Sequence, residues 1–141
     1  MECPLCAVVA AGSSHPRFLR EFRTAILVAG EHQFFPGYCV LIAKDCEREI
    51  HRLADTDQAN FFAAASRTSS ALESVYSPLK MNHAMLGNVV PHLHWHLIPR
   101  YASEIDPLAH PWAESSRFGD FQTTSAHVDD LRARLLDFLE V

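Results

Sequence analysis

The sequence predicts a mixed domain of helices and antiparallel strands. Apolar runs separated by turn residues occur within 22–43 and again within 80–98, and each pair of runs is typical of an antiparallel hairpin. Apolar residues also recur at helical spacing over about 56–76 and about 125–139. No internal repeat or linker divides the 141 residues, so we expect a single domain, 1–141, with a substantial core.

The first hairpin is predicted from two apolar runs, 22–29 and 38–43. Gly30-Glu31-His32 forms a turn after the first run, and the small and polar residues 10–16 before it predict a loop. Cys39, inside the second run, is expected to be a small buried core residue.

The two predicted helices follow from spacing and from their end signals. Around the start of the long helix, Asp55-Thr56-Asp57 offers N-caps, and Ser77-Pro78 ends it. Its aromatic residues are expected to face the core rather than a cofactor. The C-terminal helix has four apolar residues at helical spacing, which are Val128, Leu131, Leu135 and Phe138.

Three histidines alternate with large apolar residues in a strand predicted over 92–98. Side chains two apart share a face of a strand, so His92, His94 and His96 are expected to form a row of imidazoles spaced about 6.5 Å apart. The intervening apolar side chains then point into the core. Pro99 has no backbone N–H and is expected to end the strand.

An imidazole row can support several kinds of chemistry. Histidine can act as a nucleophile, carry a proton or bind a metal ion. Two histidines two apart on a strand can both reach one zinc ion, so a catalytic zinc on the row is one hypothesis. A purely structural cluster is the alternative, although packing does not readily explain three imidazoles on one face.

The cysteines suggest a metal site. The N-terminus lacks a signal-peptide pattern, which favours the cytoplasm, where structural disulfides are rare. Cys3 and Cys6 form a Cys-x-x-Cys pair whose thiolates can share one metal ion or form a redox pair. Because the pair is N-terminal and contains Pro4, we favour a metal knuckle, formed by residues 1–10, over a redox pair. Two unrelated surface cysteines are the alternative.

The charge balance limits the partners. A formal net charge of −5 without a basic stripe predicts no nucleic-acid binding, although local groups can still bind a phosphate-bearing small molecule. No apolar run is long enough for a bilayer span, so no membrane partner is expected. Arg100 and Lys80 could face an anionic substrate, but solvated strand-end charges are the simpler interpretation.

With these motifs placed, the chain resembles the histidine triad (HIT) superfamily, in particular bacterial HIT-domain proteins. The signature His-φ-His-φ-His-φ-φ, where φ is apolar, matches His92–Ile98 at every position. The resemblance covers roughly residues 1–112 and includes Pro99-Arg100-Tyr101. It implies an α+β fold, a mainly antiparallel sheet with the long helix and the C-terminal helix packed on it, usually as a homodimer.

The resemblance also implies an activity. HIT proteins are nucleotide hydrolases or nucleotidyl transferases that act at the α-phosphate. By resemblance, His94 attacks phosphorus and carries the nucleotidyl intermediate, while His92 and His96 contact phosphate oxygens and help the leaving group. A neutral His94 can attack if a hydrogen bond, for example to a strand carbonyl, holds the proton on its other nitrogen. No cofactor is required for this attack.

The resemblance implies a nucleotide substrate, with adenine or another purine, in chemistry of the dinucleoside polyphosphate hydrolase or phosphoramidase type. Asn82 matches a polar position near the ribose or phosphate, and Asn88 matches a phosphate-contacting position. Val89 departs from the pattern, since many of these hydrolases have Ser or Thr there. This departure motivates an alternative, a nucleotide-binding or regulatory HIT module with little turnover.

A structural zinc is the last feature that the resemblance implies. Many bacterial HIT proteins hold zinc through an N-terminal Cys-x-x-Cys, a histidine after the second strand and the first triad histidine. By that pattern Cys3, Cys6 and His92 are ligand candidates, and Cys46 stands in place of the remaining histidine. Three cysteines and one histidine are a sound zinc ligand set. The alternative is a protein that has lost zinc and keeps its cysteines for packing.

Overall fold

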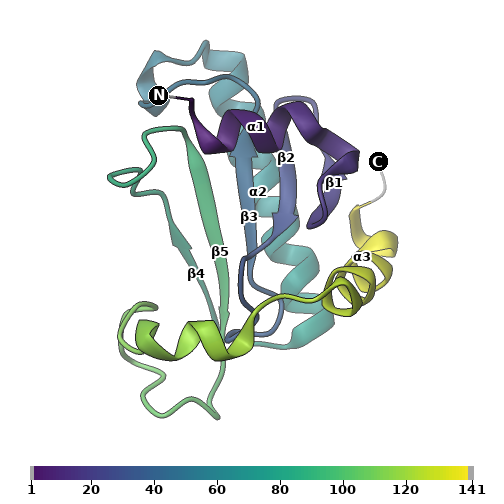
Figure 1. Ribbon diagram of the computed structural model, residues 1–141, viewed down its shortest axis with the longest axis vertical. Helices are drawn as coiled ribbons and strands as arrows, with labels where there is room; N and C mark the ends of the chain where they lie inside the picture. Colours follow the sequence, from purple (N-terminus) through teal and green to yellow (C-terminus); the bar gives the residue numbers. More distant parts are fainter. Residues whose placement is uncertain (1, 140–141) are drawn as a thin grey trace.

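A five-stranded antiparallel sheet forms the centre of the molecule, with helices on both faces (Figure 1). The computed structural model describes residues 2–139, so Met1 and residues 140–141 of the expected domain lie outside the described residues. The strands are β1 Phe18–Glu21, β2 Ala25–Ala29, β3 Cys39–Ala43, β4 Lys80–Ala84 and β5 His94–Arg100. They lie in the order β1-β2-β3-β5-β4, and each neighbouring pair is antiparallel. The expected α+β class is confirmed.

Helices and 3-10 turns connect these strands. The helices are α1 Pro4–Ala11, α2 Asp55–Tyr76 and α3 Ser125–Leu139, and the 3-10 turns are η1 Gly12–Ser14, η2 Ile50–Arg52 and η3 Ser115–Phe121. The N-cap of α2 is Ala54, so Asp55 and Asp57, which were expected as caps, lie inside the first turn. Their negative charges there interact favourably with the positive end of the helix dipole. No helix between residues 2 and 139 combines the length and the apolar content needed to cross a membrane.

The two faces of the sheet bury different side chains. Figure 1 shows α1 in front of β2 and β3, with α2 behind the sheet. The main core lies on the α2 and α3 face and includes Leu27, Leu41, Leu97, Phe61, Leu72, Leu131 and Leu135. On α3, Leu139 is buried in place of the expected Phe138, which is 52% exposed. Beneath α1 lies a smaller cluster of Ile26, Val28 and Ile42.

The alternation along β5 decides where its histidines point. Leu97 belongs to the main core, and Trp95 packs against it. Because side chains alternate along a strand, His94 and His96 lie on the opposite face of the sheet, which α1 covers. They pair with Ile42 and Val40 of β3, which lie on the same face.

Several expected boundaries were wrong. Strand β5 covers residues 94–100 rather than 92–98, and Pro99 does not end it. Pro99 pairs with Met81 of β4, whereas β3 pairs with β5 only as far as Leu97, so the missing N–H leaves no ladder bond unmade. Among the α-helices and strands, two were not expected: α1 within the N-terminal segment, and the edge strand β1, whose polar residues obscured the pattern.

Candidate functional site

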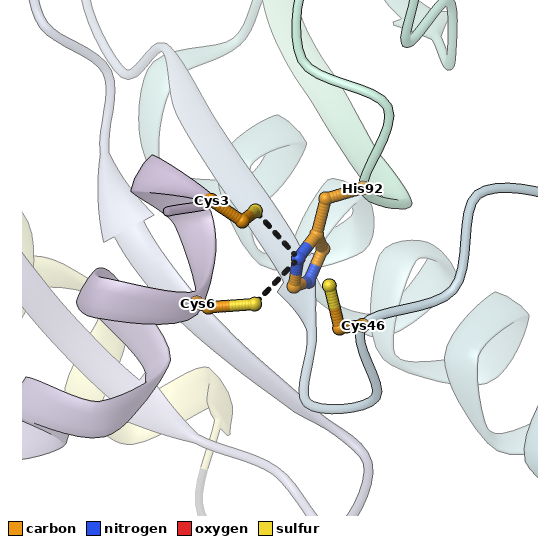
Figure 2. Close-up of side chains that lie close together, drawn as sticks. All are labelled: Cys3, Cys6, Cys46 and His92. Carbon is orange, nitrogen blue, oxygen red and sulfur yellow. Dashed lines mark hydrogen bonds between the residues drawn. The ribbon is translucent and has the colours of Figure 1, made fainter. Parts of the chain in front are cut away.

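Four candidate metal ligands meet beside the start of β5. The ligand atoms of Cys3, Cys6, Cys46 and His92 all lie within 4.8 Å of one another. Figure 2 shows Cys3 and Cys6 projecting from the start of α1, and Cys46 from the loop after β3, toward the imidazole. The Sγ atoms of Cys3 and Cys6 lie 3.4 and 3.6 Å from His92 Nδ1. The fold therefore brings together the ligand set expected from the sequence.

The orientation of His92 suits metal binding. The residue is only 1% exposed, and its Nε2 lies 2.7 Å from the carbonyl oxygen of Ala43. A carbonyl can only accept, so Nε2–H donates and the Nδ1 lone pair faces the thiols. Metal-binding histidines are commonly oriented by such a bond on the second nitrogen. Tetrahedral zinc separates sulfur ligands by roughly 3.8 Å, so these residues fit a zinc ion in both type and spacing.

The clustered thiols ionise unequally. A hydrogen bond with Cys46, followed by burial and the nearby Cys3, raises the pKa of Cys6 to about 12. Burial also raises the pKa of Cys3, but hydrogen bonds, first from the Cys6 backbone N–H and then with the His92 and Cys6 side chains, outweigh it and bring that pKa to about 7. Neighbouring thiolates repel one another, and a bound cation is the group that would stabilise all of them together.

A second constellation surrounds a cavity of about 320 Å³ on the α1 face of the sheet. His94 and His96 line it from β5, Leu5 lines it from α1, and Trp112 and Phe118 line it from the segment after β5. Most of the wall is apolar or aromatic, with a few polar groups among them, as in small-molecule sites.

His94 has a defined protonation pattern. Its Nδ1 lies 2.6 Å from the carbonyl oxygen of His92. Because this oxygen can only accept, Nδ1 carries a proton, and in the neutral imidazole Nε2 keeps its lone pair. The hydrogen bond to a carbonyl that the sequence analysis expected is present, and it comes from a residue of the metal cluster. A neutral imidazole of this tautomer can act as a nucleophile.

His96 lies next to His94, with ring centroids 5.0 Å apart and planes at 76°. Its Nδ1 lies 2.7 Å from the hydroxyl of Tyr38, and Trp112 meets its ring edge-on at 5.5 Å. Burial, followed by the charges of His94 and His32, lowers the pKa of His96 to about 4. The imidazole is therefore neutral at pH 7 and acts there through hydrogen bonds.

The expected row of three imidazoles is reduced to two. His92 precedes the first residue of β5, so strand alternation does not govern it, and its ring turns toward the cysteines. Within residues 2–139, the cluster of potential metal ligands contains His92 but neither His94 nor His96. The geometry therefore gives no support to a catalytic zinc on the row.

The two asparagines expected at the substrate lie outside the cavity lining. The Oδ1 atom of Asn82 accepts a hydrogen bond from Arg100 Nη1 at 2.9 Å. Asn88 is exposed in the loop between β4 and β5, two residues before Val90, which does line the cavity. Val89 between them is 94% exposed.

Arg100 was expected to be solvated, which is wrong. It is 3% exposed, and its Nη2 lies 2.8 Å from Glu104 Oε1. Its Nη1 also donates to the carbonyl oxygen of Ala109 at 2.7 Å. Arg100 therefore anchors the segment that leads to Trp112. The sequence offered no local signal for the cavity residues Tyr38, His32, Trp112 and Phe118, because only the tertiary fold brings them to the histidines.

Several solved structures that share this fold are named as histidine triad proteins. The HIT domain family model matches residues 18–103. A histidine triad protein from Marinobacter aquaeolei VT8 is 25% identical with a TM-score of 0.77, covering 99% of this chain and 97% of that chain. One from Bradyrhizobium japonicum is 22% identical with a TM-score of 0.76, covering 87% and 90%. A zinc-bound histidine triad family protein from Mycobacterium smegmatis is 20% identical with a TM-score of 0.71, covering 99% of both chains. No curated protein gives a significant match.

Proposed function

Because this chain belongs to the HIT-domain family, we propose that it is a nucleotide-phosphate hydrolase or nucleotidyl transferase, of the dinucleoside polyphosphate hydrolase or phosphoramidase type. It acts at the α-phosphate of a purine nucleotide through a nucleotidyl intermediate on His94. One observation carries the proposal: the hydrogen bond from His94 Nδ1 to the His92 carbonyl leaves the Nε2 lone pair free in a cavity-lining residue.

The reaction proceeds in two displacements at phosphorus. In the first, His94 Nε2 bonds to the α-phosphorus while the bond to the leaving group breaks, and the leaving group departs with that electron pair and takes a proton from water. The imidazole becomes cationic, and the His92 carbonyl stabilises its Nδ1–H. In the second, water or another acceptor attacks phosphorus, the N–P bond breaks, the acceptor's proton passes to solvent and neutral His94 is restored.

The cavity favours a nucleotide over a small phosphate ester. Its volume of about 320 Å³ falls in the range of small-molecule sites. Apolar side chains from β2 and β3, among them Val28 and Ile42, can cover a base, and Trp112 and Phe118 offer aromatic surface. The histidines lie on the same face, so a base held there would bring its phosphates to His94.

We also propose that Cys3, Cys6, Cys46 and His92 hold a structural zinc ion, and that the attack itself needs no metal. The support is the convergence of three thiols and one oriented imidazole. When bound, zinc would tie the start of α1 and the loop after β3 to the beginning of β5. A reducing cytoplasm, as the cysteine usage predicts, would keep the thiols available.

The test is intact-protein mass spectrometry after mixing with a dinucleoside polyphosphate or an AMP phosphoramidate. The His96→Gly variant should slow the second displacement, so an adduct of one AMP should accumulate. The adduct should vanish in the combined variant His94→Ala/His96→Gly. His51→Ala, which alters an exposed histidine on η2, serves as the matched control and should turn over like wild type. Full activity of His94→Ala would refute the proposed mechanism.

A nucleotide-binding module with little turnover is the second candidate. The exposed Asn88 and Val89, neither of which lines the cavity, favour it because the loop next to His94 offers no hydroxyl for a leaving group. Tight AMP binding by calorimetry, with neither adduct nor product across the same substrates, would select this candidate.

A homodimer is the proposed assembly. β4 is an edge strand of the sheet, and exposed apolar side chains flank it in the sequence: Leu79 at 61% and Leu86 at 62%. An exposed apolar strand edge commonly marks a pairing surface. Light scattering should give twice the chain mass, and Leu86→Glu should shift it toward the monomer.

A further inference from the structure

We infer that Tyr38 is a positioning residue: its hydroxyl fixes His96 as a hydrogen-bond donor toward the cavity, next to the lone pair of His94. The chemistry of this inference rests on the proposed function. The hydrogen-bond assignment rests only on the contacts of the two side chains.

The direction of the hydrogen bond follows from burial. Tyr38 is 8% exposed, and its hydroxyl lies 2.7 Å from His96 Nδ1. Among residues 2–139, the hydrogen-bond partner of the Tyr38 hydroxyl is His96 Nδ1. If Nδ1 carried the proton, the phenol proton would be buried without an acceptor, which costs more than a normal bond gains. Tyr38 therefore donates, Nδ1 accepts, and the proton of His96 is on Nε2.

The ring of Tyr38 is held in place by close packing. A Cβ atom at Gly30 would come within 2.2 Å of Tyr38 Cδ2, so the ring occupies space that only glycine leaves free. The ring of His32 also packs against it, with ring centroids 4.9 Å apart. The hydroxyl is therefore aimed at His96 by the turn between β2 and β3, not by a flexible side chain.

The two catalytic imidazoles consequently have opposite tautomers. His94 is protonated on Nδ1 and offers a lone pair, whereas His96 is protonated on Nε2 and offers a donor. Attack at phosphorus needs both: a nucleophile for the phosphorus atom and a donor for the oxygen that gains charge. Because both rings line one cavity with centroids 5.0 Å apart, a single phosphate can meet both.

His96 stays neutral in this arrangement. The ionisable groups that face it or share its cavity are His94 on β5, His32 and Glu31 in the turn after β2, Tyr38 and Arg17. Burial, followed by the charges of His94 and His32, lowers the pKa of His96. Its donor capacity at neutral pH therefore depends on the tautomer, which is the property that Tyr38 controls.

The direct test is the ¹⁵N spectrum of the imidazoles in the wild-type protein, which reads the tautomer without any turnover. His96 should show a protonated Nε2 and an unprotonated Nδ1, and His94 should show the reverse. In Tyr38→Phe, the His96 signals should move toward a tautomer mixture. A wild-type His96 protonated on Nδ1, or an unchanged tautomer in Tyr38→Phe, overturns the inference even if no substrate is ever turned over.

The kinetic test separates positioning from general stability. Tyr38→Phe should lower kcat about tenfold with KM nearly unchanged, the effect of losing one neutral hydrogen bond. In a His96→Ala background the same change should have no further effect on kcat. Tyr101→Phe is the matched control, because its hydroxyl bonds to the Pro36 carbonyl and its ring does not line the cavity. Equal kcat losses with and without His96 would contradict the inference. If Tyr38→Phe fails to fold, the wild-type spectrum still decides.

Discussion

The buried ion pair after β5 gives the sharpest stability prediction. Arg100 and Glu104 have side chains only 4% and 10% exposed, and the guanidinium also donates to Asn82 and to the Ala109 carbonyl. Replacing Arg100 by Met keeps an apolar stem against Phe35 but leaves the Glu104 carboxylate without its counter-charge. Removing one partner of a buried pair typically costs about 3–5 kcal/mol.

This loss of unfolding free energy should appear as a lower melting temperature. At roughly 2 cal/mol/K of unfolding entropy per residue, a chain of this length loses about 3 °C for each kcal/mol, so Arg100→Met should melt about 10–15 °C lower. Arg134→Ala is the matched control: its pair with Asp130 is 52% and 58% exposed, and such pairs contribute at most about 0.5 kcal/mol. The assay is chemical denaturation combined with thermal melting.

A double-mutant cycle tests the cause of that loss. Adding Glu104→Gln to Arg100→Met removes the unpaired charge while an amide oxygen can still accept from the Tyr101 backbone N–H. The double variant should therefore recover about half of the stability lost. An Arg100→Met variant within 1 kcal/mol of wild type, or a double variant as unstable as the two single losses added, would refute the reasoning.

Three further predictions concern the cavity, the metal cluster and pH. Chelation should release about one zinc ion per chain. Relative to protein in free zinc at a thousandfold its Kd, the free energy of unfolding should then fall by at least about 4 kcal/mol. Cys46→Ser should lower the zinc content measured by mass spectrometry. Trp112→Ala should raise KM about tenfold with little change in kcat, because it removes cavity wall but no reacting group, whereas Phe121→Ala, outside that cavity, should not. In the folded protein the pKa of His96 is about 4, below its ordinary value of 6.5, so protons bind the unfolded chain better and the free energy of unfolding falls as pH drops through that window. Allowing for partial exposure, the loss should reach about 2 kcal/mol and be absent in His96→Gln; equal pH profiles would contradict it.

Much of the fold was predictable because its signals are local. The apolar runs that became β2 and β3 and the helical spacing of α2 and α3 depend only on neighbouring residues. Edge strand β1 escaped prediction because an edge needs little apolar surface, and Arg20 and Glu21 break the pattern. Pro99 remained inside β5 because its nitrogen faces the side where β3 has already ended, which no local rule reveals.

The site was less predictable than the fold. The signature placed His94 and His96, but strand alternation wrongly added the ring of His92 to their row, because His92 precedes β5 and its ring turns toward Cys3 and Cys6. The burial of Arg100 depends on a carboxylate that follows it on a loop. The aromatic wall depends on contacts between segments far apart in the sequence, such as the ring of His32 stacked on that of Phe118 with centroids 4.0 Å apart, and such contacts produce no periodic pattern in the sequence.

The segment between β5 and α3 keeps part of the cavity wall separate from the strand that carries His94 and His96. It carries Trp112 and Phe118 into the cavity, yet it lies beyond residue 103, where the match to the HIT domain ends. Mutations there can reshape the wall while leaving the β5 histidines and their hydrogen bonds intact. Under the proposed function, substitutions within residues 104–124 can therefore alter which nucleotide the cavity accepts without altering the chemistry of His94.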